Sequence, residues 1–246
     1  MTRVTFHESQ RADTTVHSRE EGTFAPTRLT PGMASATPIL ILHDGITVRR
    51  LQQGDEHELA RHADNYKIWL NLTDRFPFPY DLKAAEGWLE ITSDVTKWQP
   101  TLLFSGVTAE ETREAFEARQ NGSRIPTYYV ICDNDKPIGC CGLEFDIHKF
   151  PRTAAMGYWL GEEYWGRGIA TKVASAMLQW GFDTFPWLVR IEGDAYSWNK
   201  ASMRVLQKIG MQAEGVSRLK AFKDGKYGDI HLFAKVRDGF VPEVRE

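Results

Sequence analysis

Tyr164-Trp-Gly-Arg-Gly-Ile-Ala-Thr171 connects an apolar segment, residues 153–160, to an amphipathic segment, residues 169–185. The first segment has the apolar content of a strand. In the second, apolar residues recur at i, i+4, i+7, i+8 and i+11, which places them on one face of a helix. These residues are Ile169, Val173, Ala176, Met177 and Trp180. Pro186 then ends the pattern, so the sequence predicts a strand, a glycine turn and a helix in succession.

The turn itself has the properties of an anion site. Gly166 and Gly168 let the backbone approach a ligand closely. The first turn of the following helix presents free N–H groups and a partial positive charge, which suit a phosphate or diphosphate. Arg167 and Lys172 add positive charge locally. On this pattern alone, a tight strand-to-helix turn without a ligand remains the alternative.

Two other phosphate-binding motifs fit this segment poorly. The Rossmann pattern Gly-x-Gly-x-x-Gly needs a glycine where Thr171 stands, and its acidic residue about 20 positions later is not clearly placed. A P-loop needs Gly-Lys-Ser/Thr, which the sequence lacks here. A nucleotide-binding oxidoreductase is therefore only a distant alternative.

Hydrophobic periodicity and turn residues predict the other elements. Strands are expected at residues 39–42, 46–48, 128–132, 138–145, 187–196, 217–222 and 227–236. Helices are expected at residues 55–62, 81–91 with Asp81 as N-cap, 110–120, and in a short segment capped by Asn199 and ended by Gly210. This order predicts a mixed α/β fold with a partly antiparallel central sheet flanked by helices.

The chain divides into an arm and a single body. Residues 1–38 are rich in Thr, Ser, Gly and Pro and show no apolar period, so we expect a flexible arm, with partner binding as the alternative. Residues 39–240 are expected to form one domain, with an inserted segment at about 95–124 that is a candidate lid or partner surface.

Composition excludes several classes of protein. The chain of 246 residues is 42% hydrophobic and carries a net charge of −3, which argues against disorder, fibres and a global attraction to nucleic acid or membranes. No apolar run reaches the ~18 residues that a membrane span needs, and no signal-peptide core is evident. The three cysteines lie in apolar segments without metal-ligand spacing; they are Cys132, Cys140 and Cys141. We therefore expect a cytoplasmic protein.

Zinc and covalent catalysis have weak support. The pattern H-E-x-x-x-H, formed by His57, Glu58 and His62, is one residue longer than the zinc-protease motif H-E-x-x-H. The two histidines, at i and i+5, would point ~140° apart on a helix. We expect these histidines at the surface and no metal. Cys140 and Cys141 would each need a partner histidine to carry an acyl group, and none stands at an evident position.

Four segments match motifs of one family, in the order in which that family has them. They are Asn71-Leu-Thr-Asp-Arg-Phe-Pro-Phe-Pro-Tyr80, Trp165-Gly-Arg-Gly-Ile-Ala170, Asn199-Lys-Ala-Ser-Met-Arg-Val-Leu-Gln-Lys-Ile-Gly-Met211 and Lys223-Asp-Gly-Lys-Tyr-Gly-Asp229. The second resembles the acetyl-CoA motif Q/R-x-x-G-x-G/A, with Trp165 at the first place. The chain thus resembles the GNAT superfamily of N-acetyltransferases over about residues 39–237, and within it the ribosomal-protein-alanine N-acetyltransferase-like branch.

The resemblance implies a GNAT-like fold and acetyl-CoA as co-substrate. The diphosphate is expected on the backbone amides of the turn, and the pantetheine on the backbone of the preceding strand. Asn199 and Ser202 are expected near the reactive end of the cofactor. The implied cofactor-binding residues are Leu160, Arg167, Gly168, Ile169, Ala170, Thr171, Asn199 and Ser202.

Acetyl transfer to an amine needs positioning, a proton acceptor and stabilisation of the oxyanion. Glu192 and Asp194 lie two apart on one predicted strand and so face the same side, and Glu144 is a third candidate base. For each of them, a solvated strand carboxylate is the alternative. Some members of the family protonate the thiolate with a Tyr where Leu206 stands here, so Ser202 is the candidate donor, with Tyr196 as a fallback.

We therefore expect an N-acetyltransferase that acts by direct attack in a ternary complex. The acceptor is a protein N-terminus or a small amine, including an antibiotic or a polyamine; a deep acidic pocket favours a polyamine and an open groove favours a peptide. The acceptor side is expected to involve Trp69, Arg75, Phe76, Phe78 and Tyr80, although these residues would also suit a core and turn. A catalytically silent acyl-CoA-binding module is the alternative function, and the oligomeric state is left open.

Overall fold

The structure is a computed structural model that describes residues 37–100, 124–146 and 149–242. Nearly all of the expected N-terminal arm and most of the expected insertion, including the helix predicted at 110–120, lie outside the described residues.

An eight-stranded sheet forms the centre of the molecule, in the order β1-β2-β5-β6-β7-β8-β10-β9. Its strands are β1 (Leu40–Ile41), β2 (Ile46–Arg49), β5 (Tyr128–Asp133), β6 (Lys136–Phe145), β7 (Thr153–Leu160), β8 (Arg190–Tyr196), β9 (Gln212–Lys223) and β10 (Lys226–Val236). Neighbouring strands are antiparallel except for β7 and β8, which are parallel. A separate short pair joins β3 (Gln99–Pro100) and β4 (Arg124–Ile125).

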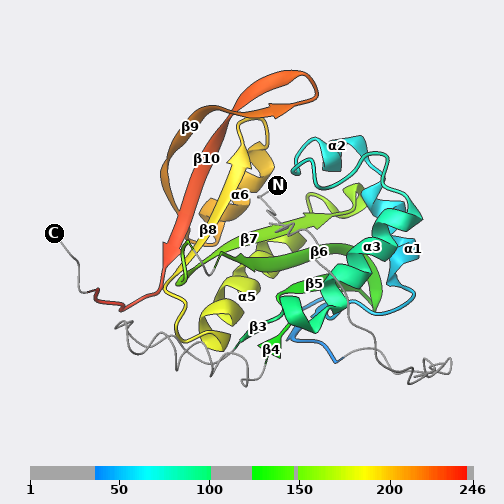
Figure 1. Cartoon of the computed structure of the whole chain (residues 1–246), viewed down its shortest axis with the longest axis horizontal. Coiled ribbons are helices and arrows are strands. Elements are labelled where there is room, and N and C mark those ends of the chain that lie inside the picture. The colour runs from blue at the N-terminus through cyan, green and yellow to red at the C-terminus, as the bar shows by residue number, and fades with distance from the viewer. Residues whose placement is uncertain (1–36, 101–123, 147–148, 243–246) are drawn as a thin grey trace, which may run out of the picture.

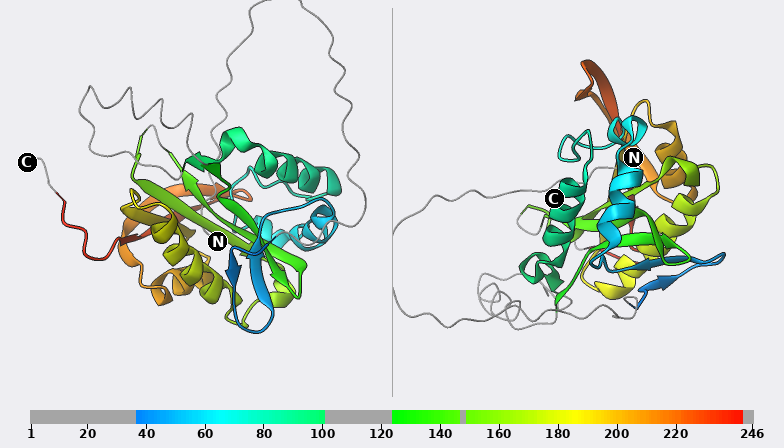
Figure 2. Two further views of the ribbon diagram at one scale, coloured as in Figure 1. Left: turned by 90° about the horizontal axis from the view of Figure 1, so that it is seen from below. Right: turned by 90° about the vertical axis from the view of Figure 1, so that its right-hand side faces the viewer.

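Helices cover both faces of this sheet (Figures 1 and 2). One face carries α1 (Asp55–Ala63) and α3 (Leu82–Ser93), and the other carries α5 (Ile169–Thr184) and α6 (Lys200–Lys208). Shorter helical segments are α2 (Tyr66–Trp69), η1 (Val95–Lys97) and η2 (Glu162–Tyr164). The mixed α/β class with a partly antiparallel sheet is confirmed.

The strands alternate between two hydrophobic cores. Met156, Leu160 and Ile191 point toward α5 and α6, where Met177 and Leu206 are fully buried. Trp159 points to the opposite face, toward α1 and α3, with Leu59, Ile68 and Ala85 in the same core. Because side chains alternate along a strand, this division fixes which face each polar residue of the sheet must occupy.

The parallel strands β7 and β8 separate after a short paired stretch. Their register pairs only Thr153 with Arg190, Ala154 with Ile191 and Ala155 with Glu192. Beyond this point β7 continues to Leu160 and β8 to Tyr196 without pairing with each other, and the two strands visibly diverge in Figure 1. The sheet therefore has an opening between the C-terminal halves of two central strands.

Local sequence signals fixed several boundaries. Asp81 caps α3 by accepting a hydrogen bond from the backbone N–H of Ala84, as its position predicts. The Asp224-Gly225 turn of the β9–β10 hairpin has positive φ at both residues, at 49° and 72°.

The expected strand at residues 187–196 begins later than predicted, at Arg190. Trp187 and Leu188 are buried in a turn after Pro186 instead. The side chain of Arg237 stabilises this turn by donating hydrogen bonds to the backbone carbonyls of Phe182, Phe185 and Leu188. Those distant bonds satisfy the turn's carbonyls without strand pairing, which the apolar local sequence could not reveal. The last hairpin is longer than predicted, since β9 already begins at Gln212.

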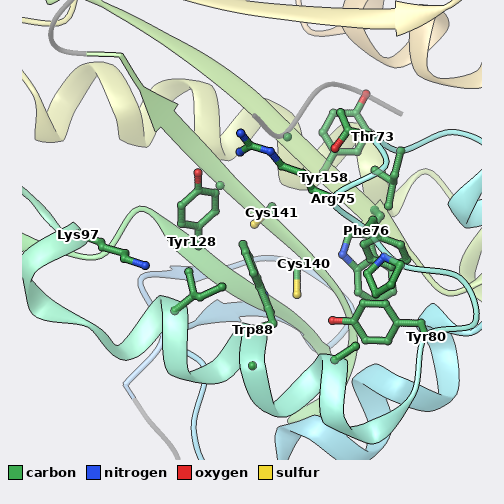
Figure 3. A pocket seen from close by; sticks show the side chains of 18 residues that line it. Thr73, Arg75, Phe76, Tyr80, Trp88, Lys97, Tyr128, Cys140, Cys141 and Tyr158 are labelled. Carbon is green, nitrogen blue, oxygen red and sulfur yellow. The ribbon is translucent and has the colours of Figure 1, made fainter. Parts of the chain in front are cut away.

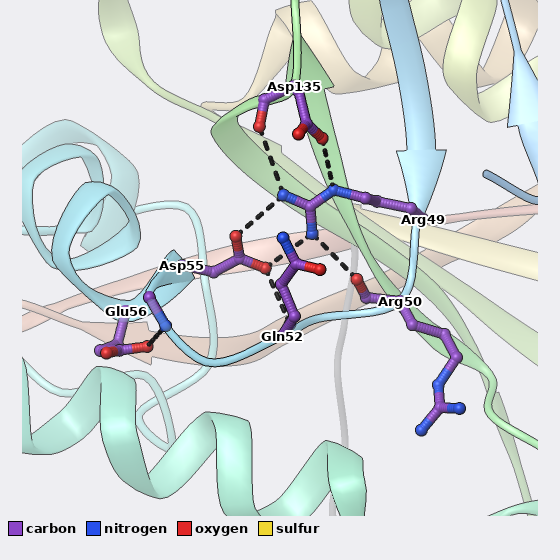
Figure 4. A network of polar contacts seen from close by, with 7 residues as sticks. Arg49, Arg50, Gln52, Asp55, Glu56 and Asp135 are labelled. Atoms are coloured by element: carbon purple, nitrogen blue, oxygen red, sulfur yellow. Dashed lines mark hydrogen bonds and ion pairs between the residues drawn. The ribbon is translucent and has the colours of Figure 1, made fainter. Parts of the chain in front are cut away.

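A buried ion pair joins β2 to the start of α1 (Figure 4). The Arg49 side chain is 1% exposed and donates to both carboxylate oxygens of Asp55, at 2.8 and 2.9 Å. Its Nε also donates to the half-exposed carboxylate of Asp135 at 2.8 Å. Burial alone would lower the pKa of Arg49, but the bonds to these carboxylates outweigh it and raise the pKa above its usual value.

Asp55→Asn is expected to destabilise the protein strongly, by about 3–5 kcal/mol, because it leaves the guanidinium of Arg49 buried without its main counter-charge. Urea unfolding measures this loss. Asp135→Asn is the matched control and should cost only about 0–1 kcal/mol, since the Asp135 carboxylate is half-exposed. Equal losses in the two variants would contradict this assignment.

Candidate active site

The glycine turn before α5 leaves the end of the helix open. Gly166 and Gly168 have φ of +75° and +77°, in the left-handed region that favours glycine. Gly168 is the N-cap of α5 and supplies no side-chain cap. The backbone N–H of Lys172 donates to the carbonyl of Gly168 at 3.1 Å, as the i to i−4 bonding of a helix requires. The N–H groups of the preceding first turn, residues 169–171, are therefore available to an anion.

Contacts from α1 and β7 hold this turn in place. The indole N–H of Trp165 donates to the carbonyl of Leu160 at 2.8 Å. His62 is buried beneath the turn, against the edge of the Tyr164 ring. A Cβ on Gly161 would lie 2.4 Å from Nδ1 of His62, so only glycine fits there. The surface position expected for His57 is confirmed, but the one expected for His62 is wrong. Burial and the nearby charge of Arg61 both lower the pKa of His62.

The two cations near the turn already face carboxylates. Nζ of Lys172 lies 3.0 Å from Asp44, and the guanidinium of Arg167 lies 3.7 Å from Asp133 and over the Tyr164 ring. Their charge is thus partly matched within the protein. An anion at this turn would therefore be held mainly by backbone N–H groups rather than by net side-chain charge.

The inner edge of β7 faces the opening in the sheet. The N–H of Gly161 donates to Ile138 of β6 at 2.8 Å, so alternation along β7 turns the backbone of Leu160 the other way, toward the opening. The carbonyl of Leu160 accepts from Trp165, while its N–H points into the opening. The cofactor-binding role of Leu160 stays a prediction.

A buried hydroxyl pair lies where α6 begins beside β7. Asn199 caps α6 by accepting from the backbone N–H of Ser202, at 3.1 Å. The Ser202 hydroxyl lies 3.0 Å from the hydroxyl of Tyr158, and both residues are at most 5% exposed. The sequence predictions named Asn199 and Ser202 but missed Tyr158. Its signal was present, because strand alternation places Tyr158 on the same face as Met156 and Leu160.

The three candidate carboxylates share one face of the sheet. Glu144, Ala155 and Glu192 are register partners across β6, β7 and β8. Ile191 and Ala195 point toward α5 and α6, so Glu192 and Asp194 point toward the α1 and α3 side.

Their surroundings differ. Glu192 lies 3.5 Å from Arg190, which also binds Glu214, whereas Asp194 lines a pocket of about 250 Å³ beyond the point where β7 and β8 separate. The fallback residue, Tyr196, lines the same pocket and donates to the carbonyl of Leu72 at 3.3 Å.

A larger pocket of about 790 Å³ opens on the same face, between α3 and strands β5 to β7 (Figure 3). Its wall includes three of the residues expected on the acceptor side, Arg75, Phe76 and Tyr80. Trp69 and Phe78 do not line it and instead pack against each other and Tyr66. The pocket's size is in the range of ~300–1,000 Å³ that small-molecule sites occupy.

Known proteins resemble this arrangement in sequence and in fold. The family model described as "Acetyltransferase (GNAT) domain" matches residues 46–212. The chain belongs to the GNAT acetyltransferase family. This GNAT protein is 29% identical over 194 residues to the uncharacterized N-acetyltransferase p20 of Bacillus licheniformis, covering 78% of this chain and 93% of that relative.

Solved GNAT structures share the fold. RimL, a ribosomal L7/L12 alpha-N-protein acetyltransferase in complex with coenzyme A, has a TM-score of 0.60 at 16% identity, covering 83% of this chain and 100% of that one. The microcin C7 self-immunity acetyltransferase MccE, in complex with acetyl-CoA and AMP, has a TM-score of 0.58 at 19% identity, covering 79% and 93%. The resemblance to this family and its ribosomal-protein branch is confirmed, and the protein is an acetyl-CoA-dependent acyltransferase.

Two further findings concern metals and membranes. Among residues 37–100, 124–146 and 149–242, no three His, Cys, Asp or Glu side chains are grouped so that they could hold a metal ion. Within the same ranges, no helix is long and apolar enough to cross a bilayer.

Proposed function

We propose that this GNAT protein transfers the acetyl group of acetyl-CoA to a primary amine by direct attack in a ternary complex. The observation that carries the proposal is the opening between β7 and β8, which has the uncapped turn of α5 at one end and carboxylates on the opposite face. A cofactor can enter from the α5 side and present its thioester to an amine on the α3 side.

The cofactor is proposed to bind mainly through backbone groups. The N–H groups of residues 167–171 hold the diphosphate, since a helix N-terminus favours an anion. The backbone N–H of Leu160, which faces the opening, donates a hydrogen bond to the pantetheine arm. Asn199 and Ser202, at the start of α6, stand beside the path that leads to the thioester.

The chemical step needs one proton acceptor and one proton donor. The amine nitrogen attacks the thioester carbon while a carboxylate takes its proton, directly or through a water. The tetrahedral intermediate then collapses, the C–S bond breaks, and the thiolate takes a proton from the hydroxyl pair of Ser202 and Tyr158. Among Glu144, Glu192 and Asp194, we favour Asp194 as the base, because it lies past the separation of the strands, whereas Glu192 is bound by Arg190.

The cysteines support direct attack over an acyl-enzyme. Cys140 and Cys141 are buried, and burial raises the pKa of both thiols above the usual range. A thiol that stays protonated is a poor nucleophile. The free, buried state of all three cysteines also supports the expected cytoplasmic location.

Tyr158→Phe is expected to lower kcat by up to about tenfold, because it removes one neutral hydrogen bond from the Ser202 hydroxyl. KM for acetyl-CoA should change little, since the substitution keeps the ring. Steady-state kinetics measure both constants. If the two hydroxyls act as a unit, adding Ser202→Ala to Tyr158→Phe should cost less than the two single losses combined. Fully additive losses would show that the two hydroxyls act independently.

The proposal is tested by free-thiol release from acetyl-CoA with a panel of amines and N-terminal peptides. Amine-dependent release supports an acetyltransferase. Tight acetyl-CoA binding without amine-dependent release across a broad panel would favour the alternative, a catalytically silent acyl-CoA-binding module. The RimL neighbour acts on a protein N-terminus, which supports placing peptides first in that panel.

A further inference from the structure

Six of the 18 described residues that line the larger pocket are aromatic. Trp88 of α3 meets the ring of Tyr128 edge-on, with the ring centres 5.2 Å apart. Phe76 stacks on Tyr80 at 4.5 Å and touches Trp159 edge-on at 5.8 Å. In Figure 3, Trp88 and Tyr128 lie to the left of Phe76 and Tyr80. Such surfaces bind flat or bulky apolar groups through area burial and ring contacts.

The charged residues that line the larger pocket would repel a polycation. The described residues that line it include Arg75 and Lys97 but no Asp or Glu. Burial raises the pKa of Tyr128, Glu144 raises it further, and Arg75 lowers it. The deep acidic pocket that would favour a polyamine is therefore not what these residues form.

The smaller pocket next door is lined by two carboxylates, Asp74 and Asp194, and by one lysine, Lys220. Thr73 lines both pockets, so they adjoin at this residue. Gly157 and Tyr158 of β7 line the larger pocket, whereas Asp194 of β8 lines the smaller one. The two pockets thus lie on either side of the opening between β7 and β8. An amine placed at this opening would have an apolar space on one side and a carboxylate on the other.

Resting on the acetyl transfer proposed above, we propose that the acceptor is an α-amine whose own side chain is large and apolar or aromatic. The amine lies at the opening, facing Asp194, and the side chain fills the larger pocket. The carboxylate or peptide carbonyl beyond the α-carbon meets the positive charge of Arg75 and Lys97. A free amino acid and a peptide N-terminus share this chemistry, and separate substrates distinguish them.

Gly87 offers a way to fill the pocket without disturbing the fold. It lies within α3 and lines the pocket, and among the described residues a Cβ placed there would meet nothing within 4 Å apart from its own helix. Leucine also favours a helix more than glycine does. Gly87→Leu therefore reduces the space for the substrate side chain while keeping the helix. Lys83→Leu adds the same group to the same helix at an exposed position outside the pocket, and is the matched control.

The experiment measures kcat/KM from free-thiol release for peptides identical except for a first residue of Phe, Leu, Ala or Gly. Free phenylalanine, free leucine and spermidine complete the panel. Phe and Leu are expected to exceed Gly by about 10- to 100-fold, in proportion to the apolar area that they bury. Gly87→Leu should lower the Phe-to-Gly ratio at least about tenfold, and Lys83→Leu should leave it unchanged. Ala84→Leu fills the pocket from a second position and repeats the test.

Each outcome separates this inference from the proposed function. Turnover that ignores the size of the side chain, or that is highest with spermidine, overturns the acceptor class and leaves acetyl transfer standing. A Phe-to-Gly ratio that both pocket-filling variants keep also overturns it. Thiol release with none of these amines, although acetyl-CoA binds, overturns the function and the inference together.

Discussion

Gly168→Asp is expected to weaken acetyl-CoA binding by about a hundredfold or more. The new carboxylate would stand at the N-cap of α5, within a few ångströms of the proposed diphosphate, and like charges at such distances repel strongly. Apart from the chain neighbours of Gly168, no atom of the described residues lies within 4 Å of the added Cβ, so a clash with them does not explain a loss. Isothermal titration with acetyl-CoA measures the effect.

Gly168→Asn separates charge from backbone strain. Asn has the shape of Asp, and both tolerate the left-handed φ of +77° at this position better than other residues do. We expect Asn to weaken binding much less than Asp, and the gap between the two variants to shrink at high salt. Equal affinities for Asp and Asn, or wild-type affinity in Gly168→Asp, would show that no anion binds at this turn.

Removing the catalytic base is expected to lower kcat by about 10²- to 10⁴-fold. Asp194→Asn should have the largest effect of the single carboxylate variants. Glu192→Gln and Glu144→Gln should have smaller effects, because Glu192 is bound by Arg190 and Glu144 lies on the far side of β7 from the opening. Steady-state kinetics with a saturating amine compare the three variants.

Acetyl-CoA affinity provides the control for these variants. It should stay near the wild-type value, since none of the three carboxylates lies at the turn that is proposed to bind the cofactor. The double variant Glu192→Gln, Asp194→Asn is the strictest form of the test. Unchanged activity in it would rule out both β8 carboxylates, and a dominant loss in Glu144→Gln would move the base to β6.

Local patterns predicted the parts of the site that depend on neighbouring residues. The glycine turn, the amphipathic α5 and the N-caps of α3 and α6 each depend on contacts within a few positions. Asn199 was predicted as a helix cap in this way, whereas the site roles of Asn199 and Ser202 follow from the resemblance to the GNAT family and stay predictions. The common face of the carboxylate pair on β8 likewise follows from a spacing of two.

Features that join distant segments escaped prediction. The Tyr158–Ser202 contact spans 44 positions and depends on how α6 packs against β7. The burial of His62 depends on the turn at Gly161, which lies far along the chain. The opening in the sheet depends on the register between β7 and β8, so neither segment alone predicts it. Likewise, Arg237 holds the turn before β8 from the far end of the domain.

The proposed reaction moves an acetyl group from acetyl-CoA to an amine. The most direct measurement follows free coenzyme A and acetylated amine together, in one reaction of the full chain with acetyl-CoA and a Phe-initiated peptide. Direct acetyl transfer predicts one thiol released for each peptide acetylated, and no release without the amine. Acetyl-CoA binding without either product, for this peptide and the rest of the amine panel, would contradict it.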